Sequence, residues 1–360
     1  MLKDEHIREI IKADSTVCEE ADSFLQSAMW AEFKSRFGWT GGAFLIDWEQ
    51  KKFPLLVLSR RLVPGFSFAY VPWGPELPEG FPAAARPQVL AELALKLKPF
   101  LARNAAFIRF DPPWYVEHTD DSAAALRDEA ASLISAGFKR AAATVQPPDT
   151  VLVDLDASIE NILAAMKSKW RYNISLAEKK GVQVNVGGAQ EMETFYGLLK
   201  ETAVRDGIAV HGIGYYKTLF EICEQRNKNG GLTLRLYTAS HEGDSLAAIM
   251  VLFRGKMATY LYGASSNIKR NLMSPYALQW RAMRDAKEAG CQCYDLFGIP
   301  PDENPNHPMA GLYRFKTGFG GRIIHRPGSW DYRYKPAVYN LFNLAEALRK
   351  KLRDRKKIRN

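Results

Sequence analysis

The sequence predicts an α/β protein built from a duplicated domain. Its 360 residues exceed the length of one typical domain, and its 47% content of apolar residues is enough for two cores. The two halves also repeat one order of elements, in which strands are followed by a helix and then by a strand that ends at or near an acidic residue. Alternating strands and helices also fit a single large sheet, so that alternative stays open.

Hydrophobic periodicity and turn residues define the elements of the first half. Ser23 can cap an amphipathic run that Gly38 ends, and Gly137 ends another helix. The strand at residues 68–75 runs into a loop rich in proline and glycine. We expect helices at residues 23–37, 87–103 and 122–136, and strands at residues 43–48, 53–58, 68–75 and 105–110.

The second half begins at the Pro/Asp-rich segment 146–150, which is the best candidate for a domain boundary. A long helix is expected at residues 158–180, where Ser158 can cap it and Gly181 can end it. Further helices are expected at residues 191–205, 214–226 and 274–289, and strands at residues 151–155, 182–186, 232–239, 245–253, 257–263, 292–295 and 322–326.

The net charge of +9 is concentrated at the C-terminus. The segment 349–359 carries a local charge of +7, which leaves only +2 for the rest of the chain. This tail can bind RNA or an anionic membrane surface, or it can be a solvated helix end. Its basic residues are Arg349, Lys350, Lys351, Arg353, Arg355, Lys356, Lys357 and Arg359.

Cysteine usage and hydropathy indicate a protein of the reducing cytosol. The four cysteines are scattered without zinc-ligand spacing, so we expect no metal. The N-terminus has no apolar signal core, and no run of about 18 apolar residues occurs. We expect a cytoplasmic monomer that can act at the inner face of the membrane.

One short stretch contains the main candidate for a catalytic residue. Residues 312–321 form an amphipathic turn with Lys316 between two phenylalanines, and the turn ends in Gly320 and Gly321. On spacing alone, Phe315 and Phe319 are core anchors of a helix, and Lys316 is a solvated lysine. A catalytic lysine is the alternative interpretation.

Six stretches in order resemble the Fem family of peptidoglycan cross-bridge aminoacyltransferases. They are Tyr70–Pro75, Gln146–Thr150, Met166–Ile174, Tyr262–Ser266, Tyr294–Ile299 and Phe315–Gly321. The resemblance implies two acetyltransferase-like (GNAT) domains in tandem with mixed sheets flanked by helices and without a coiled-coil arm. It also implies that the second domain, residues 149–320, is inserted into a first domain of residues 1–148 and 321–360.

The resemblance also implies the reaction, in which an amine attacks the ester of an aminoacyl-tRNA. The amine belongs to the stem peptide of a peptidoglycan precursor, either UDP-MurNAc-peptide or a lipid-linked form. Because the ester is already activated, the reaction needs positioning and charge stabilisation but no cofactor. By the same resemblance Lys316 stabilises transition-state charge, and Phe315 is a platform for the terminal adenine.

A missing motif separately disfavours acyl-CoA as the donor. GNAT enzymes that use acetyl-CoA hold its pyrophosphate with a glycine-patterned loop at a helix N-terminus. Residues 267–275, which follow the strand ending at Gly263, contain no such glycines.

Further candidate residues follow from the family pattern and from spacing. Lys34 and the segment 205–216 match stretches that bind the acceptor, with histidine at position 211 where some relatives have arginine. Tyr262 and Tyr260 alternate on one strand and should point to the same side, and Asp111 should be exposed and able to accept a proton. Each residue also fits a structural or solvated role. The candidates are Lys34, Arg205, His211, Tyr215, Tyr216 and Tyr262 for the acceptor, Asp111 for catalysis, and Lys167 and Arg171, on one helix face, for tRNA.

Two other functions remain compatible with the sequence. One is a GNAT-like N-acyltransferase with a different donor or an acceptor outside peptidoglycan. The other is a non-catalytic RNA-binding relative that keeps the fold. The sequence does not identify the transferred amino acid.

Overall fold

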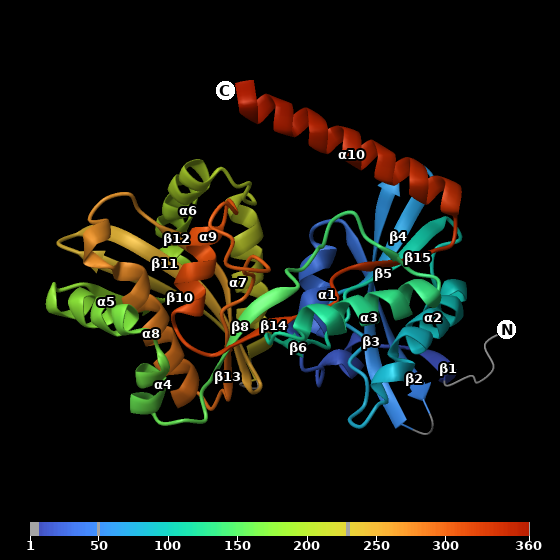
Figure 1. Ribbon diagram of the computed structural model, residues 1–360, viewed down its shortest axis with the longest axis horizontal. Coiled ribbons are helices and arrows are strands. Elements are labelled where there is room, and N and C mark those ends of the chain that lie inside the picture. The colour runs from blue at the N-terminus through green and yellow to red at the C-terminus, as the bar shows by residue number, and fades with distance from the viewer. Residues whose placement is uncertain (1–6, 49–50, 228–230, 360) are drawn as a thin grey trace. The chain divides into compact units, whose positions relative to one another are not determined.

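The computed structural model describes residues 7–48, 51–227 and 231–359, with the backbone alone over 349–359 (Figure 1). The chain divides into two compact units. Unit 1 consists of Met1–Pro148 and Arg326–Asn360, and unit 2 consists of Asp149–His325. No helix in the described part of the chain is both long enough and apolar enough to span a membrane.

Unit 1 contains a mixed sheet in the order β1-β2-β3-β4-β5-β15-β7. Strands β4 and β5 run parallel, whereas the other neighbouring pairs are antiparallel. A parallel pair needs a crossover, which the helix α2 supplies. The strands are β1 (Ile7–Ala13), β2 (Trp39–Trp48), β3 (Lys51–Val63), β4 (Phe66–Val71), β5 (Ala105–Phe110), β15 (Trp330–Arg333) and β7 (Lys139–Arg140), with the short β6 (Val116–Glu117) outside this sheet.

Helices cover both faces of the unit 1 sheet. On one face, α2 (Arg86–Leu97) and α3 (Ser122–Ser135) bury Val89, Leu93 and Leu133 in the core. On the other face lies α1 (Ala28–Ser35), so close that a side chain at Gly41 would meet the Ala31 Cβ at 3.2 Å. The helix α10 (Pro336–Arg359) starts against β5.

Unit 2 repeats this arrangement, with strands in the order β14-β8-β13-β12-β11-β10-β9. Strands β12 and β13 run parallel and are joined by the helix α8. The strands are β8 (Asp149–Asp154), β9 (Gln183–Gly187), β10 (Leu232–His241), β11 (Asp244–Arg254), β12 (Met257–Ser265), β13 (Cys293–Asp295) and β14 (Arg322–His325).

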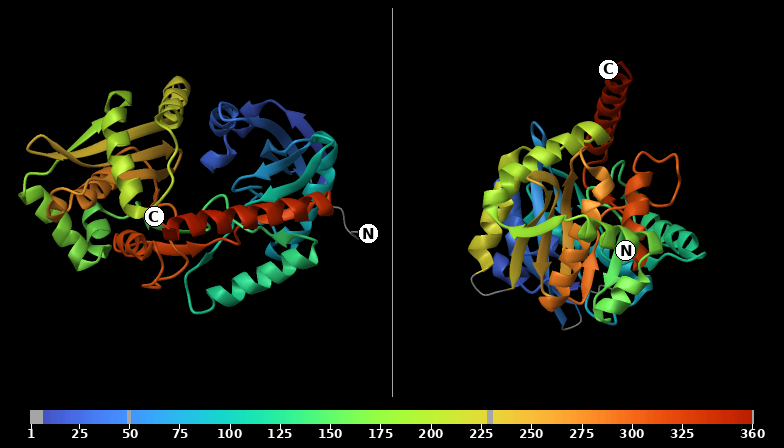
Figure 2. Two further views of the ribbon diagram at one scale, coloured as in Figure 1. Left: turned by 90° about the horizontal axis from the view of Figure 1, so that it is seen from above. Right: turned by 90° about the vertical axis from the view of Figure 1, so that its left-hand side faces the viewer.

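The unit 2 sheet is also covered on both faces (Figure 2). One core cluster joins the sheet to α4 (Ile159–Ala165), α5 (Ser168–Lys179), α8 (Ser274–Glu288) and α9 (Ala310–Thr317). The opposite face carries α6 (Met192–Asp206) and α7 (Ile213–Arg226).

The chain passes from unit 1 to unit 2 and then returns to unit 1. In unit 1, β15 pairs with β5 although it follows all of unit 2 in the sequence. In unit 2, β8 pairs with β13 and directly follows unit 1. The chain therefore completes the unit 1 sheet with β15 only after it has passed through unit 2, and it begins unit 2 with β8.

Two expected helices differ in the structure. The predicted helix 158–180 is two helices, because Met166 and Lys167 are extended, with ψ values of 152° and 144°. The predicted helix 23–37 is a 3₁₀ turn followed by α1, which Ser27 caps. The strand β1 has no counterpart among the predicted elements.

Candidate functional site

Lys316 is buried rather than solvated. It occupies the last turn of α9 and is only 6% exposed. Its Nζ donates hydrogen bonds to the backbone carbonyls of Phe297 and Gly298, at 2.8 and 2.9 Å. An ammonium has three N–H groups, so two carbonyls leave one N–H for a third acceptor.

A tight turn after β13 presents these carbonyls. Phe297 has a φ of 56°, a left-handed conformation that side chains other than glycine rarely adopt. The Asp295 carboxylate stabilises the turn by accepting hydrogen bonds from the Phe297 N–H, at 2.7 Å, and from the Thr150 hydroxyl. Asp295 thus positions the groups that hold Lys316.

Burial favours the neutral form of Lys316. Burial lowers the pKa of Lys316 to about 7, and the negative charge of Asp295 opposes this shift. The Nζ atom lies 5.0 Å from the ring centroid of Tyr260, within range of a cation–π interaction. A lysine with this pKa can donate or accept a proton near neutral pH.

The neighbouring Phe315 packs on the core while α9 docks onto α5. The Phe315 ring meets Tyr276 and Phe319 edge to face, and the Phe315 carbonyl accepts a hydrogen bond from the Trp170 indole. The Trp170 ring lies against Gly318, where a Cβ would come within 2.1 Å of it. This glycine therefore permits the close approach of the two helices.

The same docking brings Lys167 near the end of α9. The Lys167 backbone N–H donates to the Gly318 carbonyl at 2.9 Å, and the Lys167 side chain is exposed. Arg171 donates to the carbonyls of Ala164 and Met166, at the end of α4. Part of the Arg171 guanidinium therefore closes the break between α4 and α5.

Four aromatic side chains form a second cluster in unit 2. The His211 ring stacks on Tyr215 with centroids 3.9 Å apart, and Tyr216 meets Tyr262 edge to face at 5.0 Å. The Tyr262 and Tyr215 hydroxyls share a hydrogen bond. Burial raises the pKa of all three tyrosines, to about 12 for Tyr216. The cluster offers neutral phenols and one exposed histidine.

The prediction that Tyr260 and Tyr262 point to the same side is wrong. Tyr260 lies opposite Val251 and Tyr262 opposite Met250, because a β-bulge interrupts the β11–β12 pairing between them. Opposite residues of an antiparallel pair share a face, and an inserted residue reverses the alternation. Tyr260 therefore faces α8 and Lys316, whereas Tyr262 faces α7.

Arg205 is committed to structural contacts. Its guanidinium donates to the Ser265 carbonyl at 2.8 Å, to the Ser265 hydroxyl at 3.1 Å and to the Asn267 side chain at 3.0 Å, and it pairs with Asp206. These bonds attach the end of α6 to the end of β12. Binding of an acceptor by Arg205 stays a prediction that requires some of these bonds to exchange.

In unit 1, Lys34 lies among aromatic rings. Its Nζ is 5.4 Å from the Trp30 ring and 5.5 Å from the Trp39 ring. Arg60 also lies over Trp39, at 5.5 Å. Burial, together with the positive charge of Arg60, lowers the pKa of Lys34 to about 8. Lys34 and Arg60 place two positive charges over the Trp39 ring, which favours binding of an anionic ligand.

Asp111 is not exposed, which corrects the prediction. It is 4% exposed and accepts hydrogen bonds from the Tyr70 hydroxyl at 2.5 Å and from the Gln146 N–H at 3.3 Å. Burial raises the pKa of Asp111. Tyr70 and Gln146, both distant in the sequence, cover the carboxyl group, so a proline-flanked position in the sequence did not mean solvent access.

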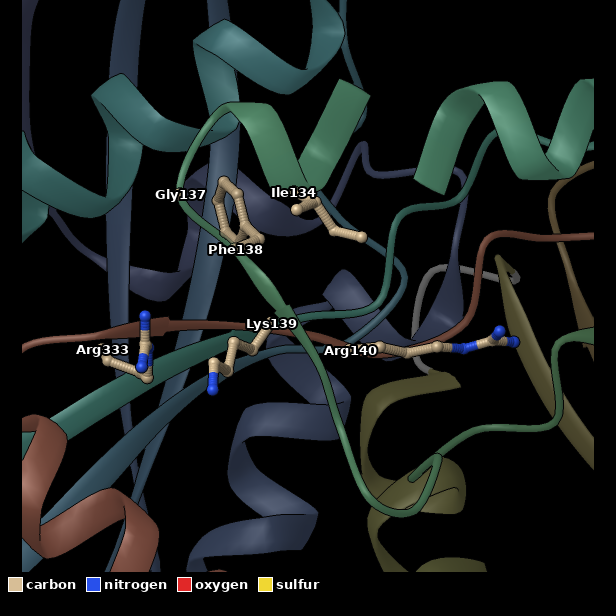
Figure 3. Close-up of a pocket in the computed structure, with 6 residues that line it drawn as sticks. All are labelled: Ile134, Gly137, Phe138, Lys139, Arg140 and Arg333. Carbon is tan, nitrogen blue, oxygen red and sulfur yellow. The ribbon is translucent and has the colours of Figure 1, made fainter. Parts of the chain in front are cut away.

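One pocket, of about 360 Å³, lies elsewhere in unit 1 (Figure 3). Its lining residues are Ile134, Gly137, Phe138, Lys139, Arg140 and Arg333, none of them a predicted site residue. Arg140 extends away from Arg333, so the three cations do not converge (Figure 3). Within the described ranges, no group of three His, Cys, Asp or Glu side chains could hold a metal.

Sequence reasoning overlooked three residues around these clusters. Tyr260 and Asp295 were not among the candidates, yet Tyr260 contacts Lys316 and Asp295 stabilises the turn that holds it. The signal for Tyr260 was Gly263, where a Cβ would stand 1.8 Å from the Tyr260 hydroxyl. Arg60 carried no local signal, because cross-strand neighbours are distant in the sequence.

The chain matches a known family over most of its length. A model described as the FemAB family matches residues 16–229 and 233–347. Lipid II:glycine glycyltransferase of Staphylococcus saprophyticus is 23% identical over 379 aligned residues, which cover 88% of this chain and 89% of the relative. The protein of the same name from Staphylococcus aureus is 22% identical over 382 residues, with the same coverage.

Solved structures support the fold. A crystal structure of FemX matches with a TM-score of 0.77 and 20% identity, covering 93% of this chain and 100% of that chain. A tandem GNAT protein from the clavulanic acid biosynthesis pathway matches with a TM-score of 0.50 and 13% identity, covering 90% and 98%. These likenesses confirm the predicted fold of tandem GNAT-like domains with mixed sheets.

Proposed function

Because this chain belongs to the FemAB family, we propose that it transfers an amino acid from aminoacyl-tRNA to a side-chain amine of a peptidoglycan precursor. The related glycyltransferases are named for lipid II, which favours a lipid-linked acceptor over a soluble nucleotide precursor. The chain is a transferase that forms an amide in cross-bridge synthesis. Contact of the basic tail with a membrane belongs to the same proposal.

The observation that carries the proposal is the geometry of Lys316. Attack of the amine on the ester forms a C–N bond, breaks the C–O bond to the ribose and passes through an oxyanion. Two carbonyls hold Lys316 in place and leave one N–H of the ammonium for that oxyanion. The same N–H can then protonate the departing ribose oxygen, and the proton that the attacking nitrogen loses as the amide forms returns Lys316 to its ammonium form. Phe315 and Lys316 adjoin in α9, so the terminal adenine would lie beside the reacting ester.

The exposed basic residues at the start of α5 support a nucleic-acid donor. Lys167 and Lys169 are exposed, and α5 docks directly onto α9. Basic residues at a helix N-terminus oppose the helix dipole, so they are not placed there for helix stability. They would bind backbone phosphates of the tRNA, together with the part of Arg171 that its carbonyl contacts leave available.

Two groups of residues, one in each unit, are separate candidates for binding the acceptor. Lys34, held among tryptophans beside Arg60, would bind a diphosphate, and an anion there would offset the burial and the Arg60 charge that lower the Lys34 pKa. The tyrosine cluster with His211 would bind the sugar or peptide portion through its hydroxyls. The burial of Asp111 argues for a supporting role through Tyr70 rather than direct proton transfer.

The test is a transfer assay with a pool of charged tRNAs, in which the soluble and lipid-linked precursors are offered separately and products are read by mass spectrometry. We expect transfer that RNase abolishes, and a loss of roughly 10²–10³-fold in the Lys316→Met variant. Lys179→Met, which changes an exposed lysine at the other end of α5, should leave the rate unchanged.

Three results would contradict the proposal. Transfer from acyl-CoA but not from charged tRNA would identify the alternative N-acyltransferase, to which the tandem GNAT likeness points. Full transfer by the folded Lys316→Met variant would remove Lys316 from the mechanism. Binding of tRNA without any transfer would indicate the non-catalytic relative.

A further inference from the structure

Among the side chains that the structure describes, those of the first turns of α10 pack on unit 1. Tyr339 is 2% exposed, donates a hydrogen bond to Asp331 at 3.0 Å and meets the Phe107 ring at 5.2 Å. Phe342 lies 6.1 Å from the same ring. The helix then continues beyond the sheet of its own unit (Figure 1). Its start is packed on unit 1, and several of the described side chains that follow are exposed.

A second apolar stripe runs along α10. Leu341, Leu344 and Leu348 are 69%, 59% and 53% exposed. Spacings of three and four residues place them within about 60° of one another around the helix, away from Tyr339 and Phe342. In the sequence, Leu352 continues the same spacing. Three exposed leucines in line are costly in water and indicate a partner surface.

The charge of the same helix indicates what that surface is. The segment 349–359, which is helical, holds eight basic residues and one acid. An apolar stripe that leads into a basic segment is typical of helices that lie in the interface of a lipid bilayer. Basic residues near an anionic bilayer are attracted to its headgroups. RNA would use the charge but leave the leucines exposed, and a second copy of this helix would be repelled.

We propose that α10 docks the protein on the anionic surface of a lipid bilayer. Leu341, Leu344 and Leu348 enter the acyl-chain boundary, and the basic segment binds the headgroups. This inference rests on the membrane contact proposed above and names the residues and the lipid chemistry that make it. Binding to lipid is measurable without the transfer reaction, so the two proposals can fail separately.

The test is co-sedimentation of the full chain with vesicles. We expect binding to vesicles of phosphatidylcholine mixed with phosphatidylglycerol, weak binding to pure phosphatidylcholine, and loss of binding at high salt. The triple variant Leu341→Gln, Leu344→Gln, Leu348→Gln should bind the anionic vesicles at least about tenfold more weakly. A matched triple variant at exposed apolar sites elsewhere, Leu95→Gln, Ile134→Gln, Val204→Gln, should bind like the original chain.

Three outcomes would overturn the inference. Equal binding by the leucine variant would show that charge alone holds the protein at the surface. Equal binding to both vesicle types would remove the role of the anionic headgroups. If the leucine variant instead converts a dimer to a monomer in analytical ultracentrifugation, a second copy covers the stripe. Transfer to the soluble precursor should stay unchanged in the leucine variant, since Lys316 is in the other unit.

Discussion

The Lys316 side chain combines two demands that conflict in water. A low pKa makes proton transfer easy, yet oxyanion stabilisation needs the charged form. Burial lowers the pKa, whereas the carbonyls of Phe297 and Gly298 together with Asp295 favour the charged form. Asp295 therefore acts on the lysine both through its charge and through the turn that it stabilises.

The pH dependence of transfer should report the Lys316 pKa. If the ammonium is the active form, kcat/KM falls as pH rises through about 7. Because Asp295 raises this pKa, Asp295→Asn should move the falling limb toward lower pH. Thr150→Val removes a hydrogen bond to the same carboxylate but keeps its charge. The kcat/KM of this variant should therefore fall at the same pH as in the original protein. Profiles of kcat/KM against pH for the three proteins are the measurement.

A kcat/KM that rises through the same pH would instead assign Lys316 as a general base.

Stability provides an independent check on the Lys316 pKa. An unfolded lysine titrates near 10.4, so between about 7 and 10.4 the unfolded state holds the extra proton. The penalty of burying Lys316 should therefore diminish as pH rises across that range, and Lys316→Met should remove this dependence.

At the scale of single residues, the sequence identified chemical types better than environments. Lys316 was singled out because its motif is local, and its catalytic role stays a prediction. The exposure of Asp111 was predicted wrongly, since its burial depends on Tyr70 and Gln146, which are distant in the sequence. The pKa values of Lys34 and Lys316 depend on burial by several elements, which no local pattern encodes.

Among the elements, β12 shows how one bulge organises two clusters. The inserted residue directs Tyr260 toward Lys316 and Tyr262 toward α7. Gly263 leaves room for the Tyr260 ring. Simple alternation predicted a single side for both tyrosines, because a bulge depends on pairing with β11 rather than on the sequence of β12 alone.

Gly263→Ala should therefore destabilise unit 2 by about 1–3 kcal/mol, since the new Cβ would displace the Tyr260 ring. Urea unfolding followed by circular dichroism measures the change. Gly311→Ala is the control, because a Cβ there meets nothing within 4 Å and alanine favours a helix. A Gly263→Ala variant as stable as the control would mean that Tyr260 has another position available.

The break between α4 and α5 was also invisible to sequence patterns. Apolar residues continue at helical spacing through Ile162, Met166 and Trp170, so one long helix was expected. In the structure the break lets Trp170 bond to the Phe315 carbonyl and lie on Gly318. Tertiary contacts with α9 outweigh the local preference for a continuous helix.

At the scale of the whole molecule, the two sheets share one strand order. The equivalent positions next to β5 and β13 are filled by β15 and β8. The repeated order of elements was visible in the sequence, and the family resemblance implied that the chain returns to the first domain. Which strands pair was not visible, since pairing is long-range. Arg109 and Asp331 show how strongly unit 1 depends on β15: both are buried and joined by two hydrogen bonds, at 2.7 and 2.8 Å.

We therefore propose that unit 2 can fold alone and that the N-terminal part of unit 1 cannot. The fragment 149–325 should unfold cooperatively, whereas the fragment 1–148 should not, because Arg109 would be buried without Asp331. Adding a peptide of residues 326–360 should restore a cooperative transition to 1–148. Circular dichroism of each fragment is the measurement, and a cooperative transition of 1–148 alone would contradict the proposal.

The position of β15 in the chain also affects the order of events during synthesis. A ribosome that has finished residue 148 must add roughly 180 more residues before β15 emerges, which takes roughly 10–40 s at bacterial speeds. Throughout that interval β5 has no neighbour on one side, and Arg109 has no carboxylate partner. Unit 2 is complete earlier, so the part of the protein made first is the last to finish folding. Nascent unit 1 is therefore the stage at which chaperone binding should be sought.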